Sequence, residues 1–367
     1  MKVLIQLSHP AHFHLYKNVA HNLMDDGHKV FILIKTKDIL EDLLKQSGLP
    51  YYNILQEAHR KNKLGILWDV FVRDWRMLRF VKKHKIDLLT GSTPEVAQVG
   101  WLTRKCRINT GEDDMRVVPL FQKMAGPFIQ SMLSPAVCDN WKIECKSVKY
   151  DSYHELAYLH PYHFSADKRV VEKYFQTDSP YFILRFSSLN AHHDAGIKGI
   201  DAEIAQRLVD ILKPHGRIYI TSERELEPQF ESYRIKINTL DMHHVMAFAA
   251  LYIGDSQTMA AEAGVLGVPF VRFNDFVGRI GYLNELEDVY HLGFGIKASE
   301  QGSAEKMYEV VKGILDMPNK KEEWWARRQK MLSEKIDYAQ FLTWFIENYP
   351  ESKRTMQENP DYQYRFK

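Results

Sequence analysis

Residues 251–274, LYIGDSQTMAAEAGVLGVPFVRFN, carry the most specific chemical pattern in the chain. The apolar run Leu251–Ile253 predicts a buried strand, and the Gly254-Asp255 pair predicts a tight turn after it. Ser256 is a favoured N-cap, so Gln257 and Thr258 would begin a helix whose first N–H groups have no helical acceptor. These donors and the helix dipole favour a phosphate group. An ordinary capped βα unit without a ligand is the alternative.

The same helix carries a carboxylate one turn further on. Glu262 lies on the face of Thr258, about 6 Å away at helical spacing. A carboxylate there would repel phosphate, but it could accept hydrogen bonds from the diol of a ribose. Small residues around it allow close packing on a sheet, and Gly267 predicts the end of the helix. The pattern is therefore compatible with a nucleotide at this helix start, although capped βα units are common.

Three histidines follow the first apolar run, at His9, His12 and His14. They lie at the expected carboxyl end of a strand, where α/β proteins bind their ligands. An imidazole titrates near neutral pH and could act as a general base. Two alternatives are a helix cap with packed or solvated rings, and a zinc site that lacks an obvious fourth ligand. We expect at least one histidine at the ligand site and no bound metal.

Two further loops carry groups suited to a diphosphate or a sugar. The first follows the strand Tyr181–Phe186 and offers cations, hydroxyls and backbone donors. The second follows the strand Arg217–Thr221, where a structural N-cap at Ser222 is the alternative. The candidate residues of the two loops are Arg185, Ser187, Ser188, Lys198, Ser222 and Glu223. A polar surface loop is the plain alternative for the first, although its length favours function.

The predicted helix Leu64–Lys85 combines an aromatic stripe with positive charge. Trp68 and Trp75 recur at helical spacing, and Arg76 and Lys83 belong to a run of basic residues. Such a helix could lie on an anionic membrane beside a lipid-linked acceptor. A helix that buries its aromatic residues and exposes a basic face is the alternative.

Length and composition limit the class of protein. The 367 residues suffice for two domains, and 45% are hydrophobic. A net charge of +2 argues against a general nucleic-acid-binding protein. The three cysteines have no CxxC spacing, and no apolar run suggests a signal peptide or a membrane span. We therefore expect a reduced cytoplasmic protein, at the inner face of the membrane if the basic helix docks there. Homodimerisation stays open.

Strands alternate with helices in both halves of the chain, which predicts an α/β fold with parallel sheets. We expect two Rossmann-like domains that face each other across a cleft. The predicted parts are an N-terminal, acceptor-side domain at 1–160, a nucleotide-sugar-binding domain at 161–325, a helix at 326–350 that returns to the first domain, and a polar tail at 351–367.

Three sequence blocks support a resemblance: SHPAHFHLYKNV at the start, YHELAYLHP at 153–161, and the run from SERELEP through GDSQTMAAEAGVLGVPFVRFNDFVGRIGYLNELE. Together they resemble a domain-of-unknown-function family whose members are similar to GT-B glycosyltransferases and to non-hydrolysing UDP-N-acetylglucosamine 2-epimerases. The match extends to about Lys297. The resemblance implies phosphate contacts at Ser256, Gln257 and Thr258 and a ribose contact at Glu262. It also implies a base in the first loop.

In the epimerases, glycines usually follow the serine at this position. Here Gln257 and Thr258 replace them, so side chains could contribute where the backbone approaches less freely. The resemblance favours a metal-independent glycosyltransferase without a cofactor. It would use a nucleoside diphosphate sugar, with UDP as the expected nucleotide, and a sugar or lipid-linked acceptor in surface-polysaccharide assembly. The alternatives are a nucleotide-sugar epimerase or hydrolase, and a non-catalytic regulator that binds nucleotide sugar or polysaccharide.

Overall fold

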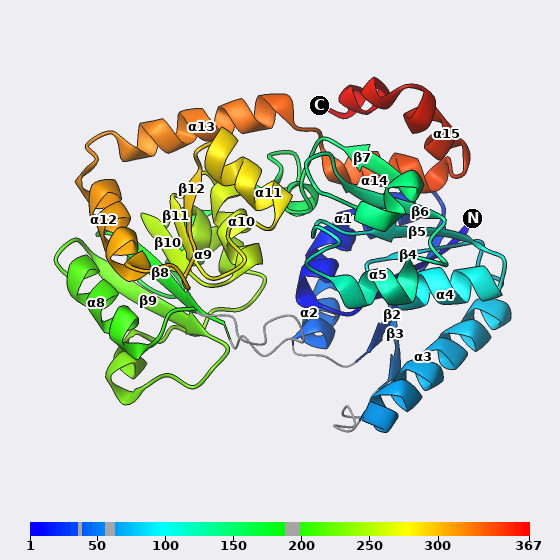
Figure 1. The fold of residues 1–367 in the computed structure, drawn as a ribbon, viewed down its shortest axis with the longest axis horizontal. Helices are drawn as coiled ribbons and strands as arrows, with labels where there is room; N and C mark the ends of the chain where they lie inside the picture. Colours follow the sequence, from blue (N-terminus) through cyan, green and yellow to red (C-terminus); the bar gives the residue numbers. More distant parts are fainter. Residues whose placement is uncertain (36–38, 56–62, 188–198) are drawn as a thin grey trace. The chain divides into compact units, whose positions relative to one another are not determined.

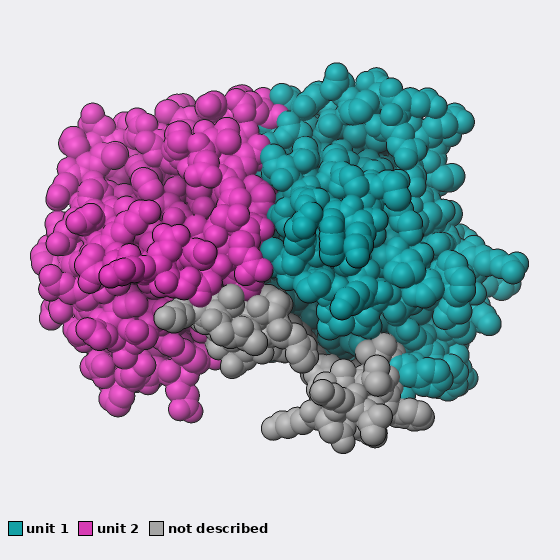
Figure 2. All heavy atoms as spheres, in the orientation of Figure 1, with its two compact units in different colours: residues 1–158, 335–367 teal, residues 159–334 magenta. Residues whose placement is uncertain are grey.

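The structure is a computed structural model that describes residues 1–35, 39–55, 63–187 and 199–367 (Figure 1). The described chain forms two compact units, which are coloured separately in Figure 2. Unit 1 comprises Met1–Tyr158 and Lys335–Lys367, and unit 2 comprises Leu159–Glu334. Each unit is built on one parallel sheet, so the predicted α/β class is confirmed.

Unit 1 contains a seven-stranded sheet in the order β3-β2-β1-β4-β5-β6-β7, and every neighbouring pair is parallel. The strands are β1 (Lys2–Leu7), β2 (Lys29–Lys35), β3 (Tyr51–Leu55), β4 (Leu88–Gly91), β5 (Cys106–Thr110), β6 (Ser131–Pro135) and β7 (Ser147–Tyr150). β1 and β2 are buried over most of their length and contain long apolar runs, as strands covered on both faces do.

The helices of unit 1 include those that cross between parallel strands. They are α1 (Pro10–Asp25), α2 (Leu40–Ser47), α3 (Lys63–His84), α4 (Pro94–Leu102), α5 (Pro119–Ala125), η1 (Trp141–Lys146), α6 (Leu156–Leu159, at the boundary), α14 (Tyr338–Glu347), α15 (Glu351–Glu358) and η4 (Pro360–Phe366). Gly48 ends α2 in the left-handed region at φ 71°, a conformation that glycine adopts without strain.

The strand order of unit 1 reverses between β1 and β4. The chain proceeds from β1 outward through β2 to β3, and then returns to add β4 on the other side of β1. In open α/β sheets, ligands bind beyond the carboxyl ends of the strands at such a switch point. The residues that follow β1 and β4 therefore occupy the place in this unit where a ligand site is expected.

Unit 2 contains a five-stranded parallel sheet in the order β12-β11-β10-β8-β9. Its elements are α7 (Lys168–Val171), β8 (Tyr181–Phe186), α8 (Ala202–Leu212), β9 (Arg217–Ser222), η2 (Pro228–Tyr233), α9 (Met242–Ala247), β10 (Leu251–Gly254), α10 (Gln257–Leu266), β11 (Phe270–Phe273), α11 (Gly281–Asn284), the π-helical turn η3 (Glu285–Val289), β12 (Gly293–Ile296), α12 (Ser303–Asp316) and α13 (Lys320–Glu334).

The switch point of unit 2 lies between β8 and β10. β9 pairs with one side of β8, whereas β10 pairs with the other side. The turn after β10 is the one predicted to begin a phosphate-binding helix, and the loop after β8 is a second candidate. The topology therefore brings two predicted ligand-binding segments to one point.

The C-terminal region differs from the single helix expected at 326–350. α13 ends at Glu334 and α14 begins at Tyr338, because the three residues between them make specific contacts in unit 1. Lys335 Nζ lies 2.5 Å from Asp151 Oδ1, and Asp337 Oδ1 accepts the Ala339 amide at 3.0 Å as the N-cap of α14. The last residues, expected as a polar tail, form α15 and η4.

The basic helix α3 packs against α4 in unit 1. Met77 and Val81 share a core cluster with Val96 and Val99, and Trp75 remains 49% exposed. Arg76 and Lys83 are exposed as well, and the Trp68 side chain lies outside the described residues. Within the described part of the chain, no helix is both long enough and apolar enough to cross a membrane.

Candidate active site

The helix start predicted to bind phosphate has the expected geometry in unit 2. Ser256 precedes α10 with an extended backbone, and its Oγ accepts the Met259 amide at 3.4 Å. Gly267, in the left-handed region at φ 81°, ends the helix. Ser256, Gln257 and Thr258 are half-buried, so the first turn is accessible to a ligand. The amides of this first turn point along the axis toward the switch point.

Asp255 fixes the position of this turn against the neighbouring strands. It is 2% exposed, and its Oδ1 accepts the Ser187 amide at 2.7 Å. Its backbone carbonyl accepts a hydrogen bond from Asn274 Nδ2 at 3.1 Å. Burial raises the pKa of Asp255. Asp255 thus joins the ends of β8, β10 and β11 at the carboxyl edge of the sheet.

The Gln257 side chain has a structural partner. Arg272, which is fully buried, donates from Nη1 to Gln257 Oε1 at 2.6 Å. The same guanidinium makes a two-pronged contact with Glu287, at 2.8 and 3.1 Å. Burial raises the pKa of Glu287, and the Arg272 charge opposes this shift. The Gln257 side-chain oxygen therefore serves the buried ion pair, and a phosphate contact at this residue would have to come from its backbone.

Glu262 occupies the position one turn below Thr258, and it is buried. Its Oε1 lies 2.9 Å from His243 Nε2, and both residues are 5% exposed. His243 belongs to α9, so two helices hold this carboxylate in place. A ribose contact through Glu262 therefore requires the diol to reach a carboxylate that already has a fixed orientation.

Arg185, near the end of β8, lies against Glu223, the residue after β9. The Arg185 guanidinium pairs with the Glu223 carboxylate, so the two predicted ligand contacts compensate each other's charge. Ser222 Oγ accepts the Arg224 amide at 3.1 Å and donates to the Arg224 carbonyl at 2.7 Å, which closes a local turn instead of capping a helix. Ser188 and Lys198 lie outside the described residues.

The three histidines after β1 in unit 1 have three different environments. His9 is exposed and caps α1, since its Nδ1 accepts the Ala11 amide at 3.2 Å. His12 is half-buried, and its Nδ1 lies 3.4 Å from both the amide and the Oγ of Ser8. His14 is buried, with its ring 5.2 Å from the rings of Phe13 and Tyr158. His12 thus combines partial exposure with a position at the β1 switch point.

Another histidine of unit 1, His154, pairs with a carboxylate at the same sheet edge. His154 Nδ1 lies 3.3 Å from Glu112 Oε2, in the segment after β7 and the loop after β5. Burial lowers the pKa of His154 to about 3, so this imidazole is neutral at physiological pH. Glu155, the next residue, is fully buried. The arrangement suits a structural or orienting role better than proton uptake from solvent.

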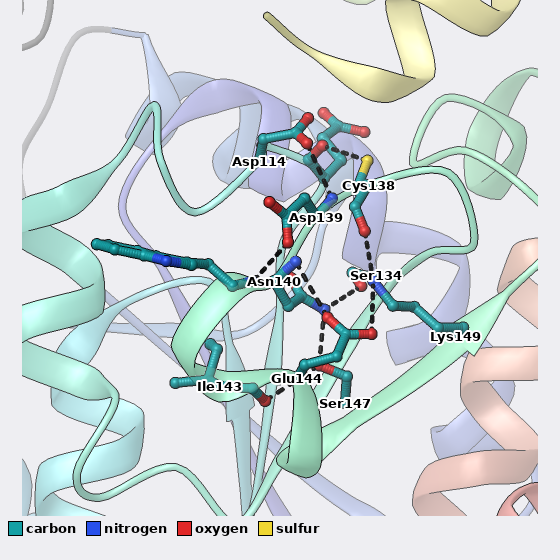
Figure 3. Close-up of polar contacts among 11 residues, drawn as sticks. Asp114, Ser134, Cys138, Asp139, Asn140, Ile143, Glu144, Ser147 and Lys149 are labelled. Carbon is teal, nitrogen blue, oxygen red and sulfur yellow. Dashed lines mark hydrogen bonds and ion pairs between the residues drawn. The ribbon is translucent and has the colours of Figure 1, made fainter.

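A hydrogen-bond network supports these carboxyl-edge loops (Figure 3). The buried Asn140 donates to Ser134 Oγ at 2.5 Å and to Ser147 Oγ at 2.7 Å. The loop after β6 is tied to the loop after β5, because Cys138 Sγ donates to the Glu112 carbonyl at 2.9 Å and the Asp139 amide donates to Asp114 at 2.8 Å. The acidic run that begins at Glu112 therefore has a defined position.

The chain resembles known proteins in its structure. No protein family's sequence profile matches the chain, and no curated protein sequence matches it. Among solved structures, UDP-GlcNAc 2-epimerase from Neisseria meningitidis bound to UDP-GlcNAc is 12% identical, with a TM-score of 0.66 over 97% of this chain and 100% of the other.

Two further solved structures contain a bound nucleoside diphosphate. A UDP-bound MnaA from S. aureus is 11% identical, with a TM-score of 0.66 over 96% of this chain and 97% of the other. The spinosyn rhamnosyltransferase SpnG complexed with thymidine diphosphate is 13% identical, with a TM-score of 0.63 over 95% of this chain and 100% of the other. The chain is thus similar in structure to GT-B glycosyltransferases and to UDP-GlcNAc 2-epimerases, and its α/β fold is of this type.

Several residues of the site were not predicted from the sequence. Asp255 was assigned only to a turn, and its position directly after a buried strand was the available signal. His243, Arg272 and Glu287 lie 15 to 19 residues from their partners, so no local pattern connects them. Among the described residues, no group of three or more His, Cys, Asp or Glu side chains could hold a metal ion.

Proposed function

We propose that the chain is an enzyme that uses a nucleoside diphosphate sugar, with the diphosphate bound at the first turn of α10. The observation that carries this proposal is the Ser256-capped helix start at the switch point between β8 and β10, where the Ser187 amide is fixed by Asp255. Backbone donors and a helix dipole at such a point suit a diphosphate. The UDP and thymidine diphosphate named in the structurally similar proteins support the same ligand class.

We propose glycosyl transfer as the reaction. Departure of the sugar leaves negative charge on the diphosphate, and donors aimed at that charge would stabilise the transition state by about 3–4 kcal/mol for a well-placed group. The first turn of α10 would supply these donors. His12 would act as the general base on an acceptor hydroxyl if the reaction inverts the anomeric configuration. In this proposal no cofactor or metal takes part, UDP is the nucleotide, and the acceptor belongs to surface-polysaccharide assembly.

Epimerisation or hydrolysis of the nucleotide sugar is the second candidate, favoured by the likeness to UDP-GlcNAc 2-epimerases. Hydrolysis needs only water, and epimerisation needs only the movement of a proton. Incubation with UDP-sugars alone therefore distinguishes these reactions from glycosyl transfer, which needs an acceptor. Product formed without an acceptor would identify an epimerase or hydrolase. Sugar transfer only after a cell-derived acceptor is added would support the glycosyltransferase. Tight nucleotide binding without turnover under either condition would indicate a regulatory binding protein instead.

A further inference from the structure

A basic hollow lies at the amino edge of the unit 1 sheet, away from the carboxyl-edge loops described above. It forms where α4 ends and β5 begins, and its volume is about 550 Å³. Trp101 and Leu102 on its rim are 51% and 54% exposed. Arg104, Lys105 and Arg107 line the hollow together with Gln130. An open, cationic and partly apolar hollow on a surface is suited to an anionic amphiphile.

Arg107 in this hollow, and Lys353 beside Gln130, are held by neutral groups. Arg107 donates to the Phe128 carbonyl at 2.6 Å and to the Lys105 carbonyl at 3.3 Å. Gln130 accepts the Arg107 amide through Oε1 at 3.1 Å, and the Gln130 carbonyl accepts Lys353 Nζ at 2.8 Å. Because carbonyl oxygens carry no net charge, these contacts orient the cations without cancelling their charge.

Helix α3 packs beside α4, the helix whose C-terminal end lines the hollow. Its C-terminal half packs alongside α4, and both helices run to the amino edge of the sheet (Figure 1). Lys2 Nζ anchors the end of α3 by donating to the His84 carbonyl at 2.9 Å. The exposed face of α3 carries Trp75, with the Arg79 guanidinium 4.8 Å from its ring centre, followed by the exposed Lys82 and Lys83.

The geometry points to a membrane-docking surface on unit 1, in which the hollow receives the phosphate of an anionic phospholipid. Exposed Trp and Leu side chains next to Lys and Arg are the features of a protein that lies on an anionic bilayer. A second copy of the chain fits less well, since a two-fold contact would place these cations against each other. The surface uses none of the residues proposed to bind the nucleotide, so the two proposals can fail separately.

Co-sedimentation of the full chain with lipid vesicles tests this assignment. We expect binding to vesicles that contain phosphatidylglycerol, weaker binding to phosphatidylcholine alone, and release as salt is raised. Arg104→Glu/Lys105→Glu should reduce binding at least tenfold, because each basic residue near an anionic surface is worth about a fivefold change. Trp101→Ser/Leu102→Ser should weaken binding to a similar extent.

Trp325→Ser is the matched control, because Trp325 is 63% exposed on α13 and lies outside the proposed surface. It should bind vesicles like the wild type. Thermal melting checks that each variant is folded, and Arg104→Ala/Lys105→Ala replaces the charge reversal if that variant unfolds. Equal binding to both lipid mixtures, or wild-type binding by folded variants, would overturn the proposal. So would a concentration-dependent dimer that the same substitutions abolish.

Discussion

Glu262 is the residue proposed to contact a ribose, and it is also buried in the fold. Its carboxylate is oriented by His243 across two helices, and it lies one turn below the first turn of α10. A pre-oriented acceptor loses little freedom when a ribose diol binds, which favours affinity. Because Glu262 is buried, a substitution that removes its charge must preserve the side-chain volume and the contact with His243.

We predict that Glu262→Gln weakens the binding of a nucleoside diphosphate at least about tenfold. The amide keeps the volume and an oxygen for His243, but it removes the charge that makes a carboxylate a strong acceptor, worth about 1.5–3 kcal/mol for such a hydrogen bond. Calorimetry measures the effect. Pyrophosphate has no ribose, so its affinity should be unchanged. Equal affinity of the variant and the wild type for the nucleotide would remove Glu262 from the site.

His12 is the histidine whose position best suits a general base. We predict that His12→Ala lowers turnover at least about a hundredfold, the range typical of losing a general base, while nucleotide affinity is retained. His9→Ala is the matched control, since that residue caps α1 at an exposed position. The measurement is the initial rate of each variant and of the wild type on the substrate that the incubation assay identifies. Near-normal turnover of His12→Ala would show that this segment is structural.

For single residues, the sequence predicts those features that depend only on nearby residues in the chain. The N-cap at Ser256 and the helical spacing of Glu262 need only a few consecutive residues, and both positions are as predicted. The partners His243 for Glu262 and Arg272 for Gln257 come from other elements, and folding alone brings them close. For the same reason, the burial of His14 could not be distinguished from the partial exposure of His12.

Helix α10 places a dipole and a row of backbone donors at the switch point of its sheet. The first turn contains no acidic residue. Thr258 is half-buried in that turn, so a carboxylate introduced there would interact favourably with the helix and unfavourably with a diphosphate.

We predict that Thr258→Glu reduces nucleoside diphosphate affinity at least about tenfold without lowering the melting temperature. The dipole should stabilise the new charge by about 0.3–1 kcal/mol, while the charge repels the phosphates. Thr258→Gln has nearly the same size and no charge, and it should retain most of the affinity. If both variants bind equally well, the diphosphate does not lie at this helix start.

The junction between α3 and α4 contains a carboxyl group in an unfavourable setting. Arg73 pairs with Glu95 at 2.7 Å, whereas no described residue donates to the buried Oδ1 of Asp74. Burial, together with the Glu95 charge, raises the pKa of Asp74 to about 7. The folded state therefore holds this proton more tightly than the unfolded state, and the stabilisation is lost as the pH rises from about 4 to about 7.

We predict that Asp74→Asn, which mimics the protonated carboxyl, raises the melting temperature at pH 8 and has little effect at pH 4. Asp42→Asn on the exposed face of α2 is the control and should change neither value. Melting curves across this pH range provide the measurement. A constant difference between Asp74→Asn and the wild type at every pH would contradict the assignment of the proton to Asp74.

Elements were predictable where apolar runs or caps mark them. β8, β9 and β10 match the predicted strands to within one residue at each end. β5 and β6 (CRINT and SMLSP) contain polar residues that the fold buries, so no apolar run reveals them. Asp241 occupies the N-cap position of α9, but its side chain makes no capping bond, and its Oδ2 accepts the Tyr174 hydroxyl at 2.8 Å. The break before α14 has neither glycine nor proline to announce it.

For the whole molecule, alternation of strands and helices was enough to predict two parallel sheets, because parallel strands require crossovers. The order of the strands was not predictable in the same way. Which side of β1 receives β4, or which side of β8 receives β10, depends on packing across many residues. This order nevertheless decides where the candidate ligand-binding loops meet, and it places the helix start at Ser256 at the switch point of its sheet.

The central claim is that the chain binds a nucleoside diphosphate at the first turn of α10. Melting of the full chain with UDP, TDP, GDP, ADP and CDP tests it most directly. Binding at 100 times the dissociation constant adds about 2.7 kcal/mol, which should raise the melting temperature by several degrees. The account predicts such a shift with at least one of the five, and UDP is the expected ligand. No shift with any of them at millimolar concentration, while pH and salt shift the curve normally, would contradict it.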